Sequence, residues 1–259
     1  MLLKEKVAVI TGAGRGIGRA IALAYAQEGA QVVLAARSVE ALQETQAEIA
    51  KLGGTGIVIP VDIRDPDSIQ ALVAQTLDRC GRVDILVNNS GIGGPSAPLW
   101  EIAPADWEET FKVNVTGTYL CCRAFLPHMI QRRAGSIVII SSMTGKRPLL
   151  NRTPYAASKM ALVGLARTLA WETGPYNIRV NAISPGPVEG KRIEWVIRAQ
   201  AEARGISVDE ARQQFTGSSP LGQLVAASDV ADAAVFLASD KAKAITGEDL
   251  NVSAGTVMY

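Results

Sequence analysis

Tyr155 and Lys159 form the pair of side chains whose types and spacing point most directly to chemistry. They stand four residues apart, and apolar residues at helical spacing follow them, so both are expected to project from one face of a helix. A phenol is a poor acid or base at neutral pH, because its pKa is about 10, but a cation within about 4–6 Å lowers that pKa. The pair therefore predicts a usable proton donor and acceptor, although an ordinary surface pair on an amphipathic helix has the same spacing.

Ser142 precedes this pair, at the end of the apolar run 136–140. Such a run is typical of a buried strand. A hydroxyl at the carboxyl end of a buried strand faces the crevice in which open α/β sheets bind ligands. Ser142 is therefore a second candidate for a catalytic site.

A glycine-rich turn follows the first strand-like run, 7–10, and contains Gly12, Gly14, Gly16 and Gly18. Glycines permit positive φ and close approach of the backbone, and the helix that follows offers free N–H groups and a positive dipole end to a pyrophosphate. The spacing is T-G-x-x-x-G-x-G rather than the general G-x-G-x-x-G fingerprint. A simple tight turn seldom needs so many glycines, so the turn predicts a nucleotide site.

Together these motifs resemble the classical short-chain dehydrogenase/reductase family, and the resemblance extends over essentially the whole chain. The motifs that carry it are Thr11 to Gly18, Asn88-Asn89-Ser90-Gly91, Asn114, Ser142, Tyr155 to Lys159, and Pro185-Gly186. The resemblance implies reversible hydride transfer between a secondary alcohol and a nicotinamide cofactor.

The resemblance also implies a role for each catalytic candidate. Ser142 would hydrogen-bond the substrate oxygen, and Tyr155 would give or take its proton. Lys159 would hold the nicotinamide ribose and lower the pKa of the tyrosine. Asn114 would loosen its helix so that a water near the lysine completes a proton relay; without the other three residues it would be read as an exposed helix residue.

The cofactor site implied by the resemblance draws on most of the chain. Asp62 and Ile63 would meet the adenine, Asn89 would line the cofactor, and Gly186 and Val188 would cover the nicotinamide. Ser90 stands where the family usually has alanine. The expected cofactor-binding residues are Gly12, Arg15, Gly16, Ile17, Gly18, Arg37, Asp62, Ile63, Asn89, Tyr155, Lys159, Gly186 and Val188.

The end of the second strand-like run, 32–36, predicts which nucleotide is preferred. An NAD site places a carboxylate there for the ribose hydroxyls, but this chain continues with Arg37. Arg37 and Arg15 can both fork onto a phosphate, so NADP is expected and NAD is less favoured. The alternative for Arg37 is a solvated charge at the entry of a helix.

The 259 residues, with 48% hydrophobic content, suit a single α/β domain spanning residues 1–259. Strand-like and helix-like runs alternate, which predicts a doubly wound Rossmann fold with a seven-stranded parallel sheet. The expected strands are 7–10, 32–36, 56–61, 85–87, 136–140, 178–183 and 250–252. Segment 188–220 is longer than a connection needs and is predicted to be a helical substrate lid.

The composition argues against several classes of protein. The net charge of +1 gives no footprint for nucleic acid, and no apolar run reaches the roughly 18 residues of a membrane span. The apolar segment at the start is too short for a signal peptide, and Cys80, Cys121 and Cys122 have no metal-ligand spacing. A cytoplasmic, metal-free enzyme is expected, and the resemblance implies a homotetramer or a homodimer.

The sequence is compatible with three functions. The first is an NADP-linked reductase of a 3-oxoacyl thioester or other ketone. The second is an NAD-linked dehydrogenase of a small polyol or hydroxy acid. The third is a non-catalytic dinucleotide-binding module. Basic residues near the predicted site would favour an anionic substrate, unless they are solvated or paired with Glu189 and Glu194. These basic residues are Lys146, Arg147, Arg152, Lys191 and Arg192.

Overall fold

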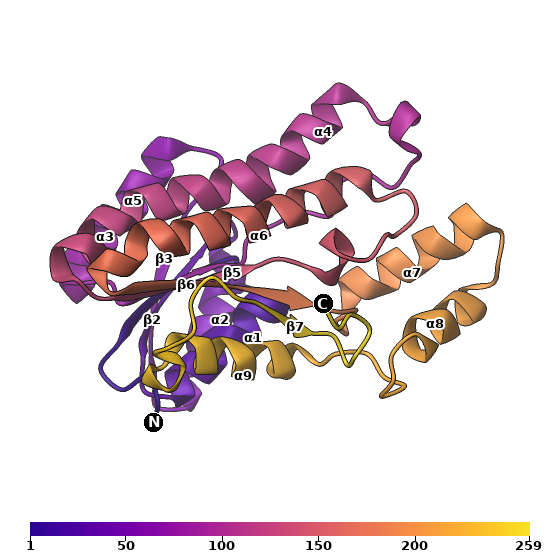
Figure 1. Cartoon of the computed structure of the whole chain (residues 1–259). Helices are drawn as coiled ribbons and strands as arrows, with labels where there is room; N and C mark the ends of the chain where they lie inside the picture. Colours follow the sequence, from indigo (N-terminus) through magenta and orange to yellow (C-terminus); the bar gives the residue numbers. More distant parts are fainter.

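All seven expected strands are present in the computed structural model, which describes residues 1–259, and their ends lie within two residues of the predicted ones. They form one parallel sheet (Figure 1). The strands are β1 Val7–Thr11, β2 Gln31–Ala36, β3 Thr55–Pro60, β4 Ile85–Asn88, β5 Gly135–Ile140, β6 Ile178–Pro185 and β7 Asp249–Val252.

The strand order is β3-β2-β1-β4-β5-β6-β7. The chain runs outward from β1 to β3 and then returns to the other side of β1 as β4. A reversal of this kind leaves a crevice at the carboxyl ends of the two central strands, β1 and β4. The predicted doubly wound fold class is confirmed, and the crevice is where the sequence places its candidate residues.

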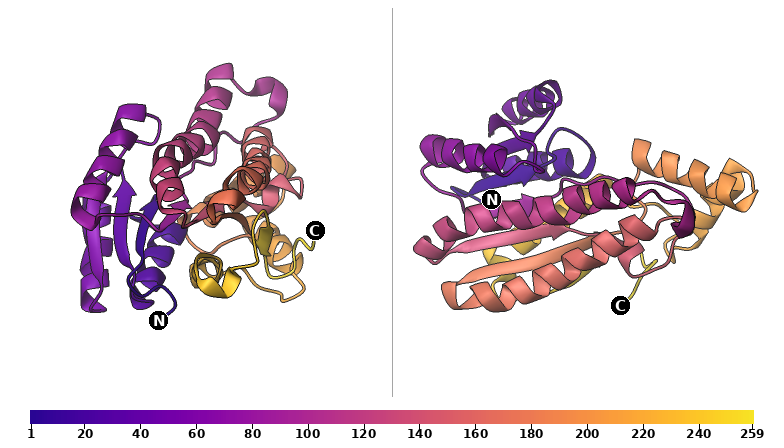
Figure 2. Two further views of the ribbon diagram at one scale, coloured as in Figure 1. Left: turned by 60° about the vertical axis from the view of Figure 1, so that its left-hand side comes forward. Right: turned by 90° about the horizontal axis from the view of Figure 1, so that it is seen from above.

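Helices cover both faces of the sheet (Figure 2). Successive residues of a strand point to opposite faces, so Val7 and Val9 pack into one core while Ala8 and Ile10 pack into the other. The first core is covered by α3 Pro66–Cys80, α5 Gly117–Arg132 and α6 Thr153–Thr173, and the second by α1 Gly16–Gln27, α2 Val39–Lys51 and α9 Ala227–Ala238. No helix combines the length and the apolar character that a membrane crossing requires.

The predicted lid segment, 188–220, contains two helices that extend beyond the carboxyl ends of the strands (Figure 1). They are α7 Lys191–Arg204 and α8 Val208–Gly217. Gly205 ends α7 in the left-handed conformation, and the Ser207 hydroxyl caps α8 by accepting from the backbone N–H of Glu210 at 3.1 Å. Ile197 and Ala211 pack into a small core of their own. The helical character is confirmed, and the covering of a substrate stays a prediction.

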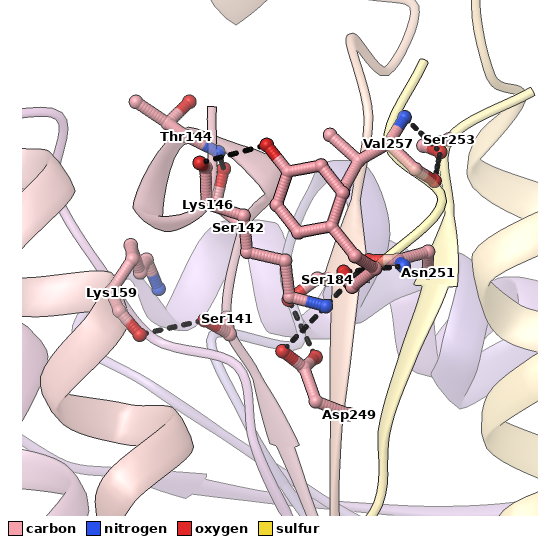
Figure 3. A network of polar contacts seen from close by, with 11 residues as sticks. Ser141, Ser142, Thr144, Lys146, Lys159, Ser184, Asp249, Asn251, Ser253 and Val257 are labelled. Atoms are coloured by element: carbon pink, nitrogen blue, oxygen red, sulfur yellow. Dashed lines mark hydrogen bonds and ion pairs between the residues drawn. The ribbon is translucent and has the colours of Figure 1, made fainter. Parts of the chain in front are cut away.

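A buried ion pair joins the loop after β5 to β7 (Figure 3). Lys146 Nζ lies 2.8 Å from Asp249 Oδ2, and the two side chains are 8% and 2% exposed. Lys146 also donates to Asn251 Oδ1 at 2.7 Å, and Ser184 Oγ donates to Asp249 Oδ1 at 2.6 Å. The loop that follows Ser142 is thereby fixed to the edge of the sheet, and Lys146 is not free to receive a substrate.

Replacing Lys146 by methionine is expected to lower the free energy of unfolding by about 3–5 kcal/mol, because Asp249 is left buried without its cation. Denaturant unfolding measures this. The double variant Lys146→Met/Asp249→Leu should regain most of the loss, and the exposed neighbour Arg147→Met should change stability by no more than about 0.5 kcal/mol. A loss for Lys146→Met as small as that for Arg147→Met would show that the pair contributes no stability.

Candidate active site

Tyr155 and Lys159 lie on one face of α6, as their spacing predicts. The helix begins at Thr153 with Pro154 in its first turn, where the missing N–H of proline costs no helical hydrogen bond. Lys159 Nζ is 5.8 Å from the centroid of the Tyr155 ring and donates to the carbonyl oxygen of Ile140 at 2.8 Å. The carboxyl end of β5 thus holds the ammonium group next to the phenol.

Ser142 lies two residues beyond the end of β5 and faces the same phenol. Its hydroxyl accepts from the backbone N–H of Thr144 at 3.2 Å, which starts the short turn Met143–Gly145. Ser141, one residue earlier, donates to the carbonyl oxygen of Lys159 at 2.8 Å (Figure 3). The end of β5 and the first turns of α6 are therefore tied together, and three of the four predicted catalytic residues meet at one point.

The charges around Tyr155 outweigh its burial. Burial of the phenol by itself would raise the pKa of Tyr155. The positive charges of Arg192 and Lys159 oppose burial most strongly, followed by a hydrogen bond with Ser142 and the charge of Arg152, and together they lower the pKa of Tyr155 to about 8. The phenol is therefore close to an even balance of acid and base forms at mildly alkaline pH.

Two arginines also lie beside the ring of Tyr155. The guanidinium carbon of Arg152 lies 5.2 Å from the centroid of the Tyr155 ring, and that of Arg192 lies 5.0 Å from the same centroid. Arg152 also lies 5.0 Å from the ring of Trp195. The sequence indicated basic residues near the site, but not that these two contact the tyrosine, because their burial and orientation depend on α7 folding over the crevice.

Asn114 sits in a π-helical turn, Lys112–Thr116, between α4 Pro104–Phe111 and α5. Its amide accepts from the backbone N–H of Ile92 at 2.8 Å and donates to the carbonyl oxygen of Ile92 at 3.0 Å and to Ser158 Oγ at 2.9 Å. A Cβ on Gly91 would lie 3.1 Å from Asn114 Oδ1 and 3.5 Å from Lys159 Nζ. The helix is thus locally loosened, and Asn114 ties the loop after β4 to α6 beside the lysine; Ser158, its partner, was missed by sequence reasoning.

The glycine turn at the end of β1 has the shape of a nucleotide cradle. Gly12 and Gly16 have φ of 69° and 53°, and a Cβ on Gly18 would collide with the carbonyl oxygen of Gly12. Nothing lies within 4 Å of where a Cβ on Gly16 would be, and no side chain caps the N-terminus of α1. Free N–H groups and open space at a helix start suit a pyrophosphate, so these residues fit a dinucleotide. Ile17 is half-buried behind the turn.

Asn89 supports the glycine turn from β4. Its side-chain amide donates to the carbonyl oxygens of Thr11 at 2.9 Å and Gly12 at 3.3 Å. The Thr11 hydroxyl in turn accepts from the backbone N–H groups of Asn89 at 3.0 Å and Ser90 at 3.1 Å. Asn89 thus fixes the turn by which a nucleotide would be held.

Asp62 follows β3 and is neutralised within the protein. Arg64 donates to both of its carboxylate oxygens, and this hydrogen bonding lowers the pKa of Asp62 to about 2, with the charge of Arg37 acting in the same direction. Arg64 also pairs with Glu109 at 2.9 Å. The side chain of Ile63 is buried in the core, only 7% exposed. Arg64 was not among the predicted residues, and the i, i+2 spacing to Asp62 was the signal for it.

Arg15 and Arg37 both lie exposed, at the start of α1 and after β2. Neither forms an ion pair with a carboxylate. No carboxylate ends β2, as the sequence predicted. Two arginine side chains are therefore free on the nucleotide side of the crevice.

Gly186 and Val188 follow β6 at the base of the lid segment. The backbone N–H of Gly186 donates to the carbonyl oxygen of Val252 at 2.8 Å, and a Cβ there would come within 2.8 Å of Ser253 Cα. Val188 pairs with Val225 in an isolated parallel bridge. These contacts anchor the start of the lid segment to β7 and to the segment before α9.

The other basic residues that the sequence placed near the site are either paired with a carboxylate or exposed. Lys146 is paired with Asp249, and Glu194 is paired with Arg212 rather than with the basic residues at the start of α7. Arg147 and Lys191 are exposed. The sequence-based alternative in which Glu189 and Glu194 pair with Lys191 and Arg192 is therefore wrong, because neither carboxylate forms an ion pair with either cation.

The chain is similar over nearly its full length to known oxidoreductases. Residues 12–257 match the family model described as enoyl-(acyl carrier protein) reductase. The chain is 36% identical over 258 residues to the 3-oxoacyl-[acyl-carrier-protein] reductase FabG of Thermotoga maritima, with 100% of each chain covered. NAD+-bound xylitol dehydrogenase has a TM-score of 0.96 at 31% identity and covers 98% of this chain and 100% of its own. An actinorhodin polyketide ketoreductase with NADPH has a TM-score of 0.94 at 36% identity, with 98% of each chain covered.

Proposed function

The chain belongs to the classical short-chain dehydrogenase/reductase family of oxidoreductases, and on that premise we propose that it interconverts a secondary alcohol and a ketone with NADP(H). The observation that carries the proposal is the convergence of Tyr155, Ser142 and Lys159 at the carboxyl end of β5, where Lys159 Nζ lies 5.8 Å from the centroid of the Tyr155 ring and the surroundings lower the pKa of Tyr155 to about 8. A proton donor and acceptor tuned to this range is what alcohol–ketone chemistry near neutral pH requires.

The residues divide the work of the reaction between them. When bound, a nicotinamide accepts or supplies the hydride at the carbinol carbon. In oxidation Tyr155 takes the proton of the substrate hydroxyl, and in reduction it returns one. Ser142 donates a hydrogen bond to the substrate oxygen as negative charge develops there. Lys159 stabilises the phenolate, and Asn114 holds α6 against the loop after β4.

The direction of the pH dependence follows from the phenol. Oxidation needs the phenolate, so its rate rises as pH rises through the pKa of Tyr155 near 8. Reduction needs the protonated phenol, so its rate falls over the same range.

The preference for NADP rests on charge at the end of β2. Arg37 and Arg15 are exposed and carry no carboxylate partner, and Asp62 is already neutralised by Arg64. A 2′-phosphate would meet positive charge there rather than a ribose-binding carboxylate. The alternative is an NAD-dependent dehydrogenase of a small polyol or hydroxy acid, since similar structures contain either NAD+ or NADPH.

The relatives support two substrate classes, a 3-oxoacyl thioester or other ketone, and a polyol. A non-catalytic dinucleotide-binding module is disfavoured, because all four catalytic positions carry competent residues and a binding module would not need them. The lid helices α7 and α8 would cover the substrate, and their residues would select it.

A homotetramer or a homodimer is the proposed assembly, in the cytoplasm. Large apolar side chains are exposed on the outer faces of α5 and α6, with Tyr119 46%, Met160 43% and Trp171 87% exposed. Exposed apolar side chains on two neighbouring helices mark a surface suited to another protein chain.

Tyr155→Phe is expected to reduce turnover by about two orders of magnitude or more, because it deletes the proton donor and acceptor while keeping the ring. Cofactor affinity should change little. Turnover and cofactor binding are measured on the same preparations, with Tyr119→Phe as the control that removes an exposed hydroxyl. Retention of more than about a tenth of wild-type turnover, with chemistry rate-limiting, would remove Tyr155 from this role.

Arg37→Ala is expected to weaken NADPH binding about tenfold or more and NADH binding hardly at all, because a charge-assisted contact to phosphate is worth about 1.5–3 kcal/mol. Titration of both cofactors into wild type, Arg37→Ala and the distant exposed variant Arg123→Ala tests this. An equal loss for the two cofactors, or a wild-type preference for NADH, would contradict the proposed NADP specificity.

A further inference from the structure

Arg152 is a buried cation that has no carboxylate partner. Its side chain is 2% exposed and is the largest of the fully buried side chains. Nη1 reaches the carbonyl oxygen of Pro95 only at 3.5 Å, Nε has no partner, and no carboxylate pairs with it. Burying an unpaired charge is costly, and proteins normally pair such a group or bring it to a ligand.

Arg192 adds a second unpaired charge at the same place. The two guanidinium carbons lie 5.2 and 5.0 Å from the same ring centroid of Tyr155. Their Nη2 atoms also lie 2.9 and 3.6 Å from the point where a Cβ on Gly93 would be. The two guanidinium groups therefore converge beside the backbone of Gly93, and an anion bound between them would offset the repulsion of the two like charges.

An anion held by Arg152 and Arg192 would lie on the substrate side of the crevice. Arg152 is held between the rings of Tyr155 and Trp195, and Arg192 is on the first turn of α7. Both are associated with the reacting phenol and the lid segment, whereas the glycine turn that would hold the cofactor pyrophosphate lies at the start of α1. The cofactor phosphates are thus expected to bind at the glycine turn and not at Arg152 and Arg192.

We propose that Arg152 and Arg192 bind an anionic group of the substrate. The substrate is then a small hydroxy acid, or the corresponding oxo acid, that carries a carboxylate, sulfonate or phosphate. Because both guanidinium groups contact the ring that bears the reacting hydroxyl, the anionic group lies only a few bonds from the carbon that exchanges hydride. This inference rests on the proposed oxidoreductase function, whose proton and hydride steps it leaves unchanged.

The test compares each acid with its neutral counterpart. The specificity constant kcat/KM is measured for 3-hydroxybutanoate and its methyl ester, with 2-hydroxypropane-1-sulfonate and 2-hydroxypropyl phosphate as the other anionic arms and 2-butanol as their neutral reference. The wild type should prefer at least one acid by about tenfold or more. Raising the ionic strength should shrink the preference, since salt screens the charges.

Arg192→Gln should lower the acid-to-neutral ratio about tenfold, and this ratio is the informative quantity because a change in the pKa of Tyr155 affects both substrates. Lys191→Gln is the matched control, since it removes one positive charge from the same exposed turn without touching the tyrosine. A neutral substrate preferred at every salt concentration, or an equal loss for acid and neutral substrate in Arg192→Gln, would overturn the inference.

A measurement without turnover separates this inference from the proposed function. Inorganic sulfate, compared with chloride at equal ionic strength, should raise the Tm of the wild type and of Lys191→Gln more than that of Arg192→Gln or Arg152→Lys. Equal stabilisation of all four proteins would overturn the anion site. If the sulfate effect is selective but no alcohol or ketone reacts with either nicotinamide cofactor, the anion site stands and the proposed oxidoreductase function fails.

Discussion

An excess of positive charge around one phenol is the constraint on which the rest of this structure depends. Lys159, Arg152 and Arg192 all lie within 5.8 Å of the centroid of the Tyr155 ring, and none of them forms an ion pair with a carboxylate. Their charge opposes the effect of burial, which by itself would raise the pKa of the phenol. Such a cluster persists only where the fold holds each cation in place from a different side.

Each cation has its own support. The end of β5 holds Lys159 through the carbonyl oxygen of Ile140, and α7 brings Arg192 and Trp195 over the crevice. The π-helical turn at Asn114 and the buried Lys146–Asp249 pair fix the loops on either side. The interrupted helix and the buried pair both lie beside the site, and π-helical turns are frequent at functional sites.

The sequence allowed much of the fold and the centre of the site to be predicted, because both depend on local patterns. Alternating apolar runs define seven strands, and the i, i+4 spacing places Tyr155 and Lys159 on one helical face. The environment of Arg152 could not be predicted, because a charged residue in a loop is usually solvated. Its burial depends on Pro95 and Trp195, which are distant in sequence. The same holds for Lys146, whose partner Asp249 is 103 positions later.

Ultraviolet titration of the tyrosines in the cofactor-free protein shows directly whether the positive charges lower the pKa of Tyr155, because it reports the phenolate without a substrate. One phenol is expected to ionise with a pKa of about 8. That signal should be absent from Tyr155→Phe and should move to higher pH in Arg192→Gln, because the positive charge that lowers the pKa of Tyr155 most is removed. A wild-type protein in which no tyrosine ionises below the ordinary phenol pKa of about 10, or a low-pH signal that survives in Tyr155→Phe, would contradict this expectation.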